Sequence, residues 1–420
     1  MKLASKNKTY DGSLPSSLFK EKLEPQLLEL AKITRNRYQE IDAIGVLGGQ
    51  SGVALFQFYC AQYFDDDAYS DTGVEIISHI MDRINDGYVY PTYCNGLAGF
   101  GWALQHLADE EFIDLDLDEL FSHFDNYLLN QMNYELNDKN YDMLHGAMGY
   151  GMYFLKRLKG KTTHPEKKEF YKKALMRLLD YFETNPIKEG NGLKWESVLD
   201  IDKGNKGFNL SLSHGMSSIV YLLTKMSDND IEKDRIAPLV KGAITYFKSH
   251  YKQSDEGFSL FPSWIDPNQS VTYNSRLAWC YGDIGIAKAF QWSGETLKEE
   301  AFMNQANIVL NATRKRMNPE NTLVVDAGFC HGSFGNAHMF HQFGLASKEE
   351  GYEKATQFWL KDGLARHTGS KEEPYKRWNA IAQLWQMECN LLEGLSGIGL
   401  AMISLLSNEE STWDECLMLR

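Results

Sequence analysis

Two short stretches of this sequence carry residues that are well suited to bind a metal ion. Cys280 and Cys330 each stand two residues before a glycine, and His331 directly follows the second of them. Two thiolates and one imidazole are three of the four ligands that zinc prefers, and a zinc with three protein ligands keeps one position for a reactant. A thiol bound at that position would lose its proton and stay nucleophilic at neutral pH. Iron or copper would accept similar ligands, but nothing in the sequence indicates redox chemistry.

Four other residues are candidates for acid–base chemistry and for binding a negatively charged oxygen. His214 directly precedes a glycine, as His331 does, and is interpreted as an acid or base; the alternative is a helix cap or a buried, hydrogen-bonded histidine. Asp142 either caps a helix or orients His214 or the substrate. Arg276 is either a surface cation or the group that binds a peptide carbonyl or a developing enolate. Tyr281 would donate a hydrogen bond to the same oxygen.

The remaining polar and thiol residues near these motifs are interpreted as structural. Asp283 and Glu393 lie at expected helix starts, where the helix dipole favours a negative charge. His338 and His341 fall inside an expected helix and are assigned to its core or its surface. The other four cysteines are interpreted as small apolar residues, at positions 60, 94, 389 and 416.

An internal repeat indicates which elements would bring the candidates together. Two small residues separated by two others, followed by an apolar run, recur seven times at intervals of about 50 to 70 residues. Each copy predicts a short helix that is apolar all round and therefore buried, and its glycines allow close approach of neighbouring backbones. Six copies have glycine at both small positions, whereas the fourth has Ser218 at the second. The predicted helices start near residues 49, 96, 146, 215, 282, 332 and 394.

A more polar, amphipathic stretch precedes each of these buried helices. In the fourth stretch, apolar residues recur at steps of three and four between Phe170 and Phe182, with lysines between them. Seven such pairs predict an all-α fold, a seven-fold α/α toroid with an inner barrel of seven helices inside an outer barrel of seven. We favour a closed ring over an open superhelix because the inner helices look buried on all sides and closure removes exposed ends. The whole chain, residues 1–420, would then be a single domain.

The predicted ring decides between two interpretations of the cysteine and histidine motifs. Without a metal, they would be two buried cysteines and a hydrogen-bonded histidine. In the ring, Cys280 and Cys330 occupy equivalent positions before consecutive inner helices, so they are neighbours in space. The long segments before the later inner helices, some with short strands, would gather at the same mouth. This placement favours a shared metal ion.

The overall composition excludes some classes of function. The formal charge of -14 argues against a nucleic-acid-binding protein, which would show a basic face. The N-terminus lacks the apolar run of a signal peptide, and no stretch reaches the roughly 18 apolar residues of a membrane-spanning helix. Six cysteines in 420 residues without a signal peptide predict a reducing cytoplasm, and any association with a membrane would come through partners.

The combination of these motifs resembles the LanC-like lanthionine cyclases. The resemblance rests on the Trp-Cys-Tyr-Gly and Cys-His-Gly motifs, the upstream Ser-His-Gly and the seven glycine-rich helix starts, and it covers about residues 40–407. It implies a toroid with one zinc ion at one mouth. The zinc ligands that it implies are Cys280, Cys330 and His331. The catalytic residues that it implies are His214, Asp142, Arg276 and Tyr281.

The activity implied by the resemblance is the formation of lanthionine and methyllanthionine rings. The substrate would be a precursor peptide with dehydroalanine or dehydrobutyrine, and a cysteine thiolate of the same peptide would attack the alkene in a Michael-type addition. His214 would protonate the α-carbon or serve the acid that does so, and Asp142 would hold His214. Because the chain ends soon after the seventh repeat, we expect a stand-alone cyclase. A separate dehydratase and an exporter, in a membrane-associated complex, are its candidate partners.

Other functions are compatible with the same residues. A LanC-like zinc protein could add glutathione or another small thiol to dehydroamino acids. A prenyltransferase would need a basic pocket for a diphosphate, but the mouth shows mainly Arg276. A glycosidase would use Asp142 and Glu393 as its carboxylate pair, which leaves the metal ligands unexplained. A non-catalytic peptide-binding toroid with a structural zinc predicts a fourth protein ligand, such as Cys389.

Overall fold

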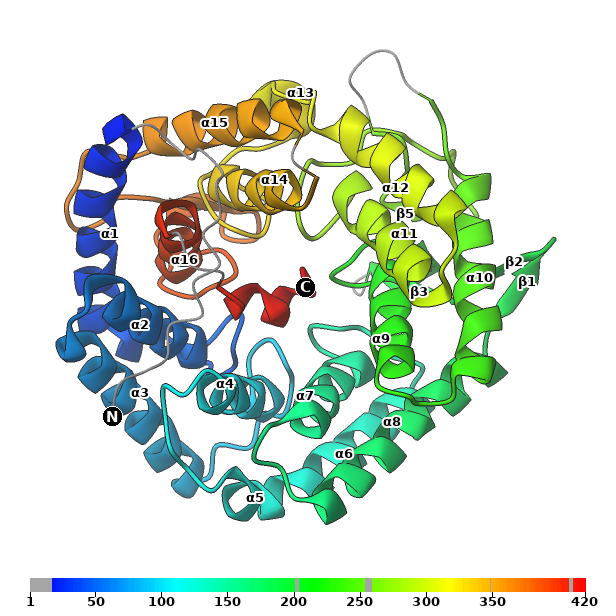
Figure 1. The fold of residues 1–420 in the computed structure, drawn as a ribbon, viewed down its shortest axis with the longest axis horizontal. Coiled ribbons are helices and arrows are strands. Elements are labelled where there is room, and N and C mark those ends of the chain that lie inside the picture. Colours follow the sequence, from blue (N-terminus) through cyan, green and yellow to red (C-terminus); the bar gives the residue numbers. More distant parts are fainter. Residues whose placement is uncertain (1–16, 201–203, 254–258, 348, 408–410) are drawn as a thin grey trace.

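The computed structural model describes residues 17–200, 204–253, 259–347, 349–407 and 411–420. Within them the predicted all-α toroid is confirmed, because two concentric rings of seven helices each surround a common centre (Figure 1). The inner helices are α2 (Gln50–Phe64), α4 (Leu97–Asp109), α7 (Ala147–Lys159), α9 (Met216–Asp228), α11 (Asp283–Leu297), α14 (Ser333–Ser347) and α16 (Leu395–Leu406). The outer helices are α1 (Ser17–Arg37), α3 (Asp67–Asn85), α6 (Ser122–Asn137), α8 (Pro165–Thr184), α10 (Lys233–Ser249), α12 (Glu300–Thr313) and α15 (Glu350–Ala365). None of the helices in the described part of the chain has the length and apolar character needed to cross a membrane.

The sequence pattern explains the two rings. Each inner helix begins one residue after the first glycine of its repeat, and α16 is buried from Leu395 to Leu405 because its residues are almost all apolar. The outer helix α8 is amphipathic instead. Its buried side chains between Tyr171 and Phe182 follow steps of three and four and face the inner ring, while none of its lysines is buried.

In five repeats the second glycine lies where the inner helix packs against the loop before it, and Gly285 packs against Leu212 in the loop before α9. A Cβ atom on Gly335 would stand 1.8 Å from the carbonyl oxygen of Phe329, so no larger residue fits without a shift of the backbone. In the fourth repeat, Ser218 is buried at this position and its hydroxyl donates a hydrogen bond to the carbonyl of Gly215 (2.7 Å). The departure therefore changes local packing at some distance from the metal ligands.

Backbone hydrogen bonds join the loops that precede successive inner helices. The amide of Cys330 donates to the carbonyl of Leu392 (2.8 Å), and the amide of Trp279 donates to the carbonyl of Cys330 (3.0 Å). The amide of Leu392 donates to the carbonyl of Leu47 (2.9 Å), which joins the seventh repeat to the first. These bonds close the ring, and they explain how candidate ligands fifty residues apart along the chain become neighbours.

Short connecting elements decorate the ring. Three small antiparallel sheets extend from the loops before α9, α11 and α16, and therefore from the mouth that carries the repeat glycines. Their strands are β1 (Ile187–Glu189) with β2 (Gly192–Lys194), β3 (Ser197–Asp200) with β4 (Asn205–Asn209) and β5 (Trp264–Ile265), and β6 (Arg377–Asn379) with β7 (Leu384–Gln386). Short helices lie in other connections, at η1 (Tyr38–Glu40), α5 (Leu117–Leu120) and α13 (Pro319–Thr322).

The C-terminal segment lies inside the inner ring, where Figure 1 shows it in red beside the centre. It contains the 3-10 helix η2 (Trp413–Leu417). The hydroxyl of Tyr93 donates to the carbonyl of Cys416 (3.0 Å), and the indole of Trp279 donates to the carbonyl of Leu417 (2.7 Å). The loops before the inner helices α4 and α11 are therefore joined through the end of the chain.

Candidate metal centre and active site

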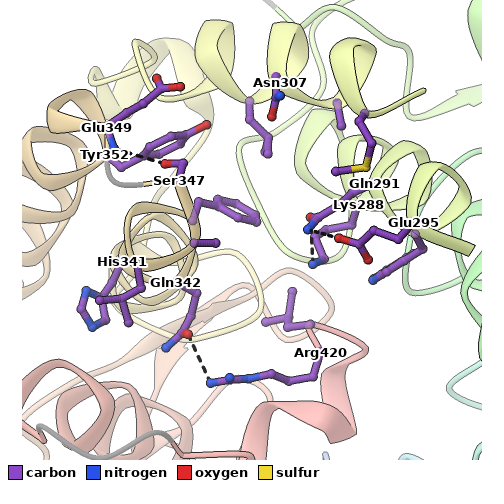
Figure 2. A pocket seen from close by; sticks show the side chains of 18 of the residues that line it. Lys288, Gln291, Glu295, Asn307, His341, Gln342, Ser347, Glu349, Tyr352 and Arg420 are labelled. Atoms are coloured by element: carbon purple, nitrogen blue, oxygen red, sulfur yellow. Dashed lines mark hydrogen bonds between the residues drawn. The ribbon is translucent and has the colours of Figure 1, made fainter. Parts of the chain in front are cut away.

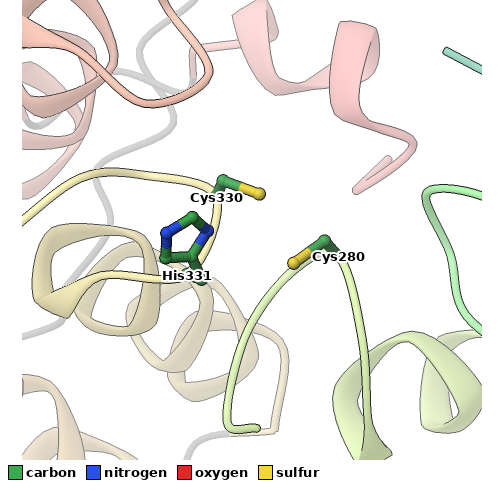
Figure 3. Close-up of side chains that lie close together, drawn as sticks. All are labelled: Cys280, Cys330 and His331. Atoms are coloured by element: carbon green, nitrogen blue, oxygen red, sulfur yellow. The ribbon is translucent and has the colours of Figure 1, made fainter. Parts of the chain in front are cut away.

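The three predicted metal ligands come together at one mouth of the inner ring (Figure 3). The ligand atoms of Cys280, Cys330 and His331 lie within 4.8 Å of one another. Zinc bonds of about 2.0 Å to nitrogen and about 2.3 Å to sulfur, in a tetrahedron, separate ligand atoms by roughly 3.5–4 Å. Small shifts would therefore bring all three atoms onto one ion. Both thiols are buried and the imidazole is partly buried, so the chemistry of the donor set and its environment fit zinc.

The turn that presents Cys280 depends on Gly282. Its φ of 92° lies in the left-handed region, which glycine adopts without the steric penalty of a side chain. The glycines before α2, α4, α7, α9 and α16 have negative φ values instead. A Cβ atom on Gly282 would also lie 2.4 Å from the carbonyl oxygen of Arg276. The chain thus folds back on itself here, which places Arg276 beside the ligands.

The three ligand side chains shift one another's pKa values. The Cys330 sulfur against the Cys280 sulfur, together with His331, holds the pKa of Cys280 well below its usual range despite burial. The same contact and burial raise the pKa of Cys330. Burial alone would lower the pKa of His331, but Asp326 and Cys280 outweigh it and raise this pKa to about 10. A divalent cation bound here would displace these protons.

His214 and Asp142 form a direct pair near the same mouth. Nδ1 of His214 lies 2.6 Å from Oδ2 of Asp142. The other carboxylate oxygen accepts hydrogen bonds from the amides of Leu144 and His145, each at 2.8 Å. The carboxylate therefore makes both kinds of contact considered from the sequence: it caps the turn before α7, and it orients His214.

The pair shifts the pKa values of both partners. Burial would lower the pKa of His214, but the charge and hydrogen bond of Asp142, with a contribution from Cys280, hold it above its ordinary value. Burial would raise the pKa of Asp142, and His214 outweighs this effect so that the carboxyl pKa is lowered. The arrangement therefore favours the protonated form of the His214 imidazole and the ionised form of the Asp142 carboxylate.

Tyr281 connects this pair to the metal ligands. It directly follows Cys280, and its ring centroid lies 5.8 Å from that of His214 and 5.8 Å from that of Trp264. Burial raises the pKa of Tyr281, so its phenol stays protonated and can donate a hydrogen bond. Arg276 is partly buried, and its charge lowers the pKa of Cys280. All seven residues predicted from the sequence thus lie around one mouth of the ring.

Comparisons with known proteins agree with this arrangement. The family described as lanthionine synthetase C-like protein matches residues 43–418. The chain belongs to this family. The nisin biosynthesis protein NisC of Lactococcus lactis subsp. lactis is 21% identical to this LanC-like chain over 280 residues, which span 62% of the chain and 64% of that relative. The structure of a nisin cyclase shares its fold with a TM-score of 0.73, at 16% identity and with coverage of 96% of this chain and 98% of the other.

Two residues at the mouth of this LanC-like chain were missed by sequence reasoning. Asp326 is buried, and its Oδ2 lies 3.3 Å from Nε2 of His331, while its Oδ1 accepts from the amide of Gly328 (3.1 Å). A carboxylate on one ring nitrogen orients a histidine so that the other nitrogen can bind a metal. Trp264 lies against Tyr281 because its strand pairs with β4. Asp326 could have been suspected from the sequence because its carboxylate lies in the loop of a metal-binding histidine. Nothing in the sequence marks Trp264.

We expect Asp326→Ala to weaken zinc binding by about 10–100-fold, since His331 would lose the contact that fixes its orientation. Competition with a chromogenic chelator would measure the zinc affinity of the purified protein. Asp266→Ala is a suitable control because Asp266 is also a buried loop aspartate, but among the described residues its carboxylate accepts hydrogen bonds only from Asn268 and Gln269. Equal zinc affinity in Asp326→Ala and the unaltered protein would show that His331 needs no such support.

Proposed function

We propose that this chain is a zinc-dependent peptide cyclase. It forms lanthionine and methyllanthionine rings by adding cysteine thiolates of a peptide to its dehydroalanine or dehydrobutyrine residues. The observation that carries this proposal is the presence of a Cys/Cys/His ligand group and a histidine–aspartate pair at one mouth of the ring. Membership of the lanthionine synthetase C-like family supports it. Zinc held by the ligand group would lower the pKa of a thiol and so supply a nucleophilic sulfur at neutral pH.

The other residues at the mouth would manage the proton and the negative charge on oxygen. When a sulfur–carbon bond forms at the β-carbon, the alkene electrons move toward the neighbouring carbonyl oxygen. Tyr281 would donate a hydrogen bond to this oxygen and Arg276 would place a positive charge near it. His214, kept protonated by Asp142, would then deliver one proton to the α-carbon. Such acid–base assistance is typically worth about 10²–10⁴ in rate.

The substrate, partners and compartment follow from the same proposal. The substrate is a dehydrated precursor peptide supplied by a separate dehydratase, and an exporter would take up the product, in a complex at the membrane. All six cysteines are unpaired in the structure, which suits a reducing cytoplasm.

The alternatives fit the geometry less well. A glycosidase needs two carboxyl groups that are available to the substrate. Asp142 is instead engaged with His214 and backbone amides, and Glu393 lies 3.1 Å from the guanidinium of Arg377. A structural zinc needs a fourth protein ligand, and Cys389 does not belong to the ligand group found among the described residues. Addition of a small thiol would use the same residues and differs only in its substrate.

The direct test is to incubate zinc-loaded protein with a dehydrated precursor peptide and to count the thiols that remain open to alkylation. Ring formation removes free thiols without a change in peptide mass. A second reaction with added glutathione separates ring formation from small-thiol addition. A peptide that gains glutathione while its own cysteines stay free would indicate small-thiol addition. No loss of free thiols from any dehydrated peptide would contradict cyclase activity.

We expect Asp142→Asn to move the alkaline limb of the cyclisation rate to lower pH. In the proposed mechanism, protonated His214 is the active form, so the rate falls as pH rises through the pKa of His214. Asp142 raises this pKa, and the asparagine would no longer do so, although its amide oxygen can still cap the turn. NMR titration of the imidazole would measure the pKa, and single-turnover rates would give the pH profile. A pKa that falls without a matching shift of the rate profile would exclude His214 as the proton donor.

A further inference from the structure

A cavity of about 690 Å³ lies at the end of the ring away from the metal ligands (Figure 2). The metal ligands precede the first residues of α11 and α14, whereas the cavity is lined by later residues of the same helices and by parts of α12 and α15. Figure 2 shows Lys288 and Glu295 of α11 on one side, and on the other Glu349, which precedes α15, and Tyr352 of α15. Its volume is within the range of pockets for small organic ligands, roughly 300–1,000 Å³.

Lys288 is unusual among the buried cations of the described chain. The other three are ion-paired: Lys156 with Asp109 and Glu415, Arg157 with Asp118, and Arg316 with Asp283. No carboxylate of the described residues lies within 4.0 Å of the Lys288 ammonium, although only 7% of the residue is exposed. Its hydrogen-bond partner is the neutral amide oxygen of Gln291 (3.1 Å). Burial of a charge with no carboxylate in contact is costly, so the position of this lysine beside a cavity points to an anion.

A second unsatisfied donor lies on the same helix. Trp292 stands one helical turn after Lys288, and residues four apart share a helix face. The indole N–H of Trp292 is buried without an acceptor in the structure. The Lys288 ammonium lies 5.3 Å from the Trp292 ring centroid and 6.0 Å from that of Phe343, which also line the cavity. The cavity therefore offers a cation and an N–H donor beside aromatic walls.

The charges around Lys288 compensate the cation only in part, because the carboxylate of Glu295 favours the charge without contacting the ammonium, and burial outweighs this effect. Lys225 also lines the cavity, and its charge acts against that of Lys288. Glu349 is engaged with Arg314 (2.7 Å), and Glu295 accepts from Gln291 (2.8 Å). Burial lowers the pKa of Lys288 to about 8, so the ammonium is still mostly protonated at pH 7.

We propose that this cavity binds a small organic carboxylate with an apolar body. Lys288 and the indole N–H of Trp292 bind the carboxylate, and the apolar body packs against Phe343 and Tyr352. The ligand is anionic because it supplies the counter-charge that Lys288 lacks. It is organic because aromatic and aliphatic side chains form much of the wall. The site is separate from the metal centre and does not depend on the cyclase activity.

Calorimetric titration of the zinc-loaded full chain tests this site, at constant ionic strength. The probes are sodium benzoate and sodium hexanoate, with benzamide, hexanamide and inorganic phosphate for comparison. We expect at least one of the two carboxylates to bind and to raise Tm, and its amide to bind at least about tenfold more weakly, because a charge-assisted hydrogen bond is lost. Lys288→Met, which keeps the unbranched stem of the side chain but removes its charged end, should weaken carboxylate binding by a similar factor.

Lys156→Met is the matched variant for stability, since Lys156 has the same exposure of 7% but is ion-paired. Without ligand, Lys156→Met should lower Tm, because it removes the buried cation that pairs with both Asp109 and Glu415, whereas Lys288→Met should not. The proposal is overturned if neither carboxylate binds, if the amides bind equally well, if only phosphate binds, or if folded Lys288→Met binds the carboxylates as the unaltered protein does. A fall in Tm on Lys288→Met as large as that on Lys156→Met would also overturn it.

Discussion

Cys330→Ala should lose bound zinc and form rings at least about 100-fold more slowly. A metal ion typically contributes several kcal/mol to the reactions that it assists, and each 1.36 kcal/mol corresponds to a factor of about ten. With Cys330 removed, only Cys280 and His331 remain to hold the ion. Metal analysis after dialysis would give the zinc content, and alkylation of residual thiols in a dehydrated peptide would give the rate.

The fold of Cys330→Ala should survive the change. Alanine removes one sulfur atom and keeps the backbone hydrogen bonds that join this loop to Leu392 and to Trp279. Zinc loss without unfolding would therefore separate a ligand role from a packing role. A protein that kept both full zinc and full activity would remove Cys330 from the set of ligands.

Cys94→Ala is the matched control. Cys94 also stands two residues before a repeat glycine, is buried like Cys330, and donates its amide hydrogen bond to the loop of the next repeat, at Leu144 (3.0 Å). Burial raises the pKa of Cys94 to about 12, so its thiol stays protonated. We expect this variant to keep its zinc and its activity. Equal losses in both variants would show that packing in the loops, rather than metal binding, is disturbed.

Much of the fold and of the candidate site could be predicted from the repeat in the sequence. The repeated glycines predict the helix starts, and equivalent positions in consecutive repeats predict that Cys280 and Cys330 meet. Both predictions need only the preference of each segment for a helix and the regular spacing of the repeat along the chain. The contact between Asp142 and His214 follows in the same way, because each residue lies in the loop of a neighbouring repeat.

Contacts that depend on irregular segments were not predictable in this way. Trp264 reaches Tyr281 only because a two-residue strand pairs with a strand more than fifty residues earlier, and strands this short leave no periodic pattern. The C-terminal segment lies in the centre of the ring, but its residues give no sign of that place in the sequence. The missing counter-charge of Lys288 is visible only when all neighbouring helices are in position.

A buried carboxylate in the C-terminal segment should make the second large contribution, in this case to the stability of the fold. Asp414 is fully buried, its Oδ2 lies 2.9 Å from Nε2 of His338, and its Oδ1 accepts from Nε of Arg420 (2.8 Å). We expect Asp414→Ala to lower the free energy of unfolding by about 3–5 kcal/mol, because it leaves buried donors without their carboxylate. Urea unfolding followed by circular dichroism would measure the change. Glu169→Ala, which removes an exposed partner of Lys173 within α8, should leave the unfolding midpoint nearly unchanged.

The same contacts predict how this contribution depends on pH. Burial would raise the pKa of Asp414, but His338 and Arg420 outweigh it, so the carboxyl pKa lies below the ordinary value of 3.8. The unfolded chain then binds more protons than the folded one in acid, and the stabilisation is present above pH 3.8 and is lost as pH falls through the lower, folded-state pKa. The difference in stability between Asp414→Ala and the unaltered protein should therefore be constant near neutral pH and shrink below about pH 4. A difference that stayed the same in acid would mean that the loss comes from the missing side-chain volume, because packing does not titrate.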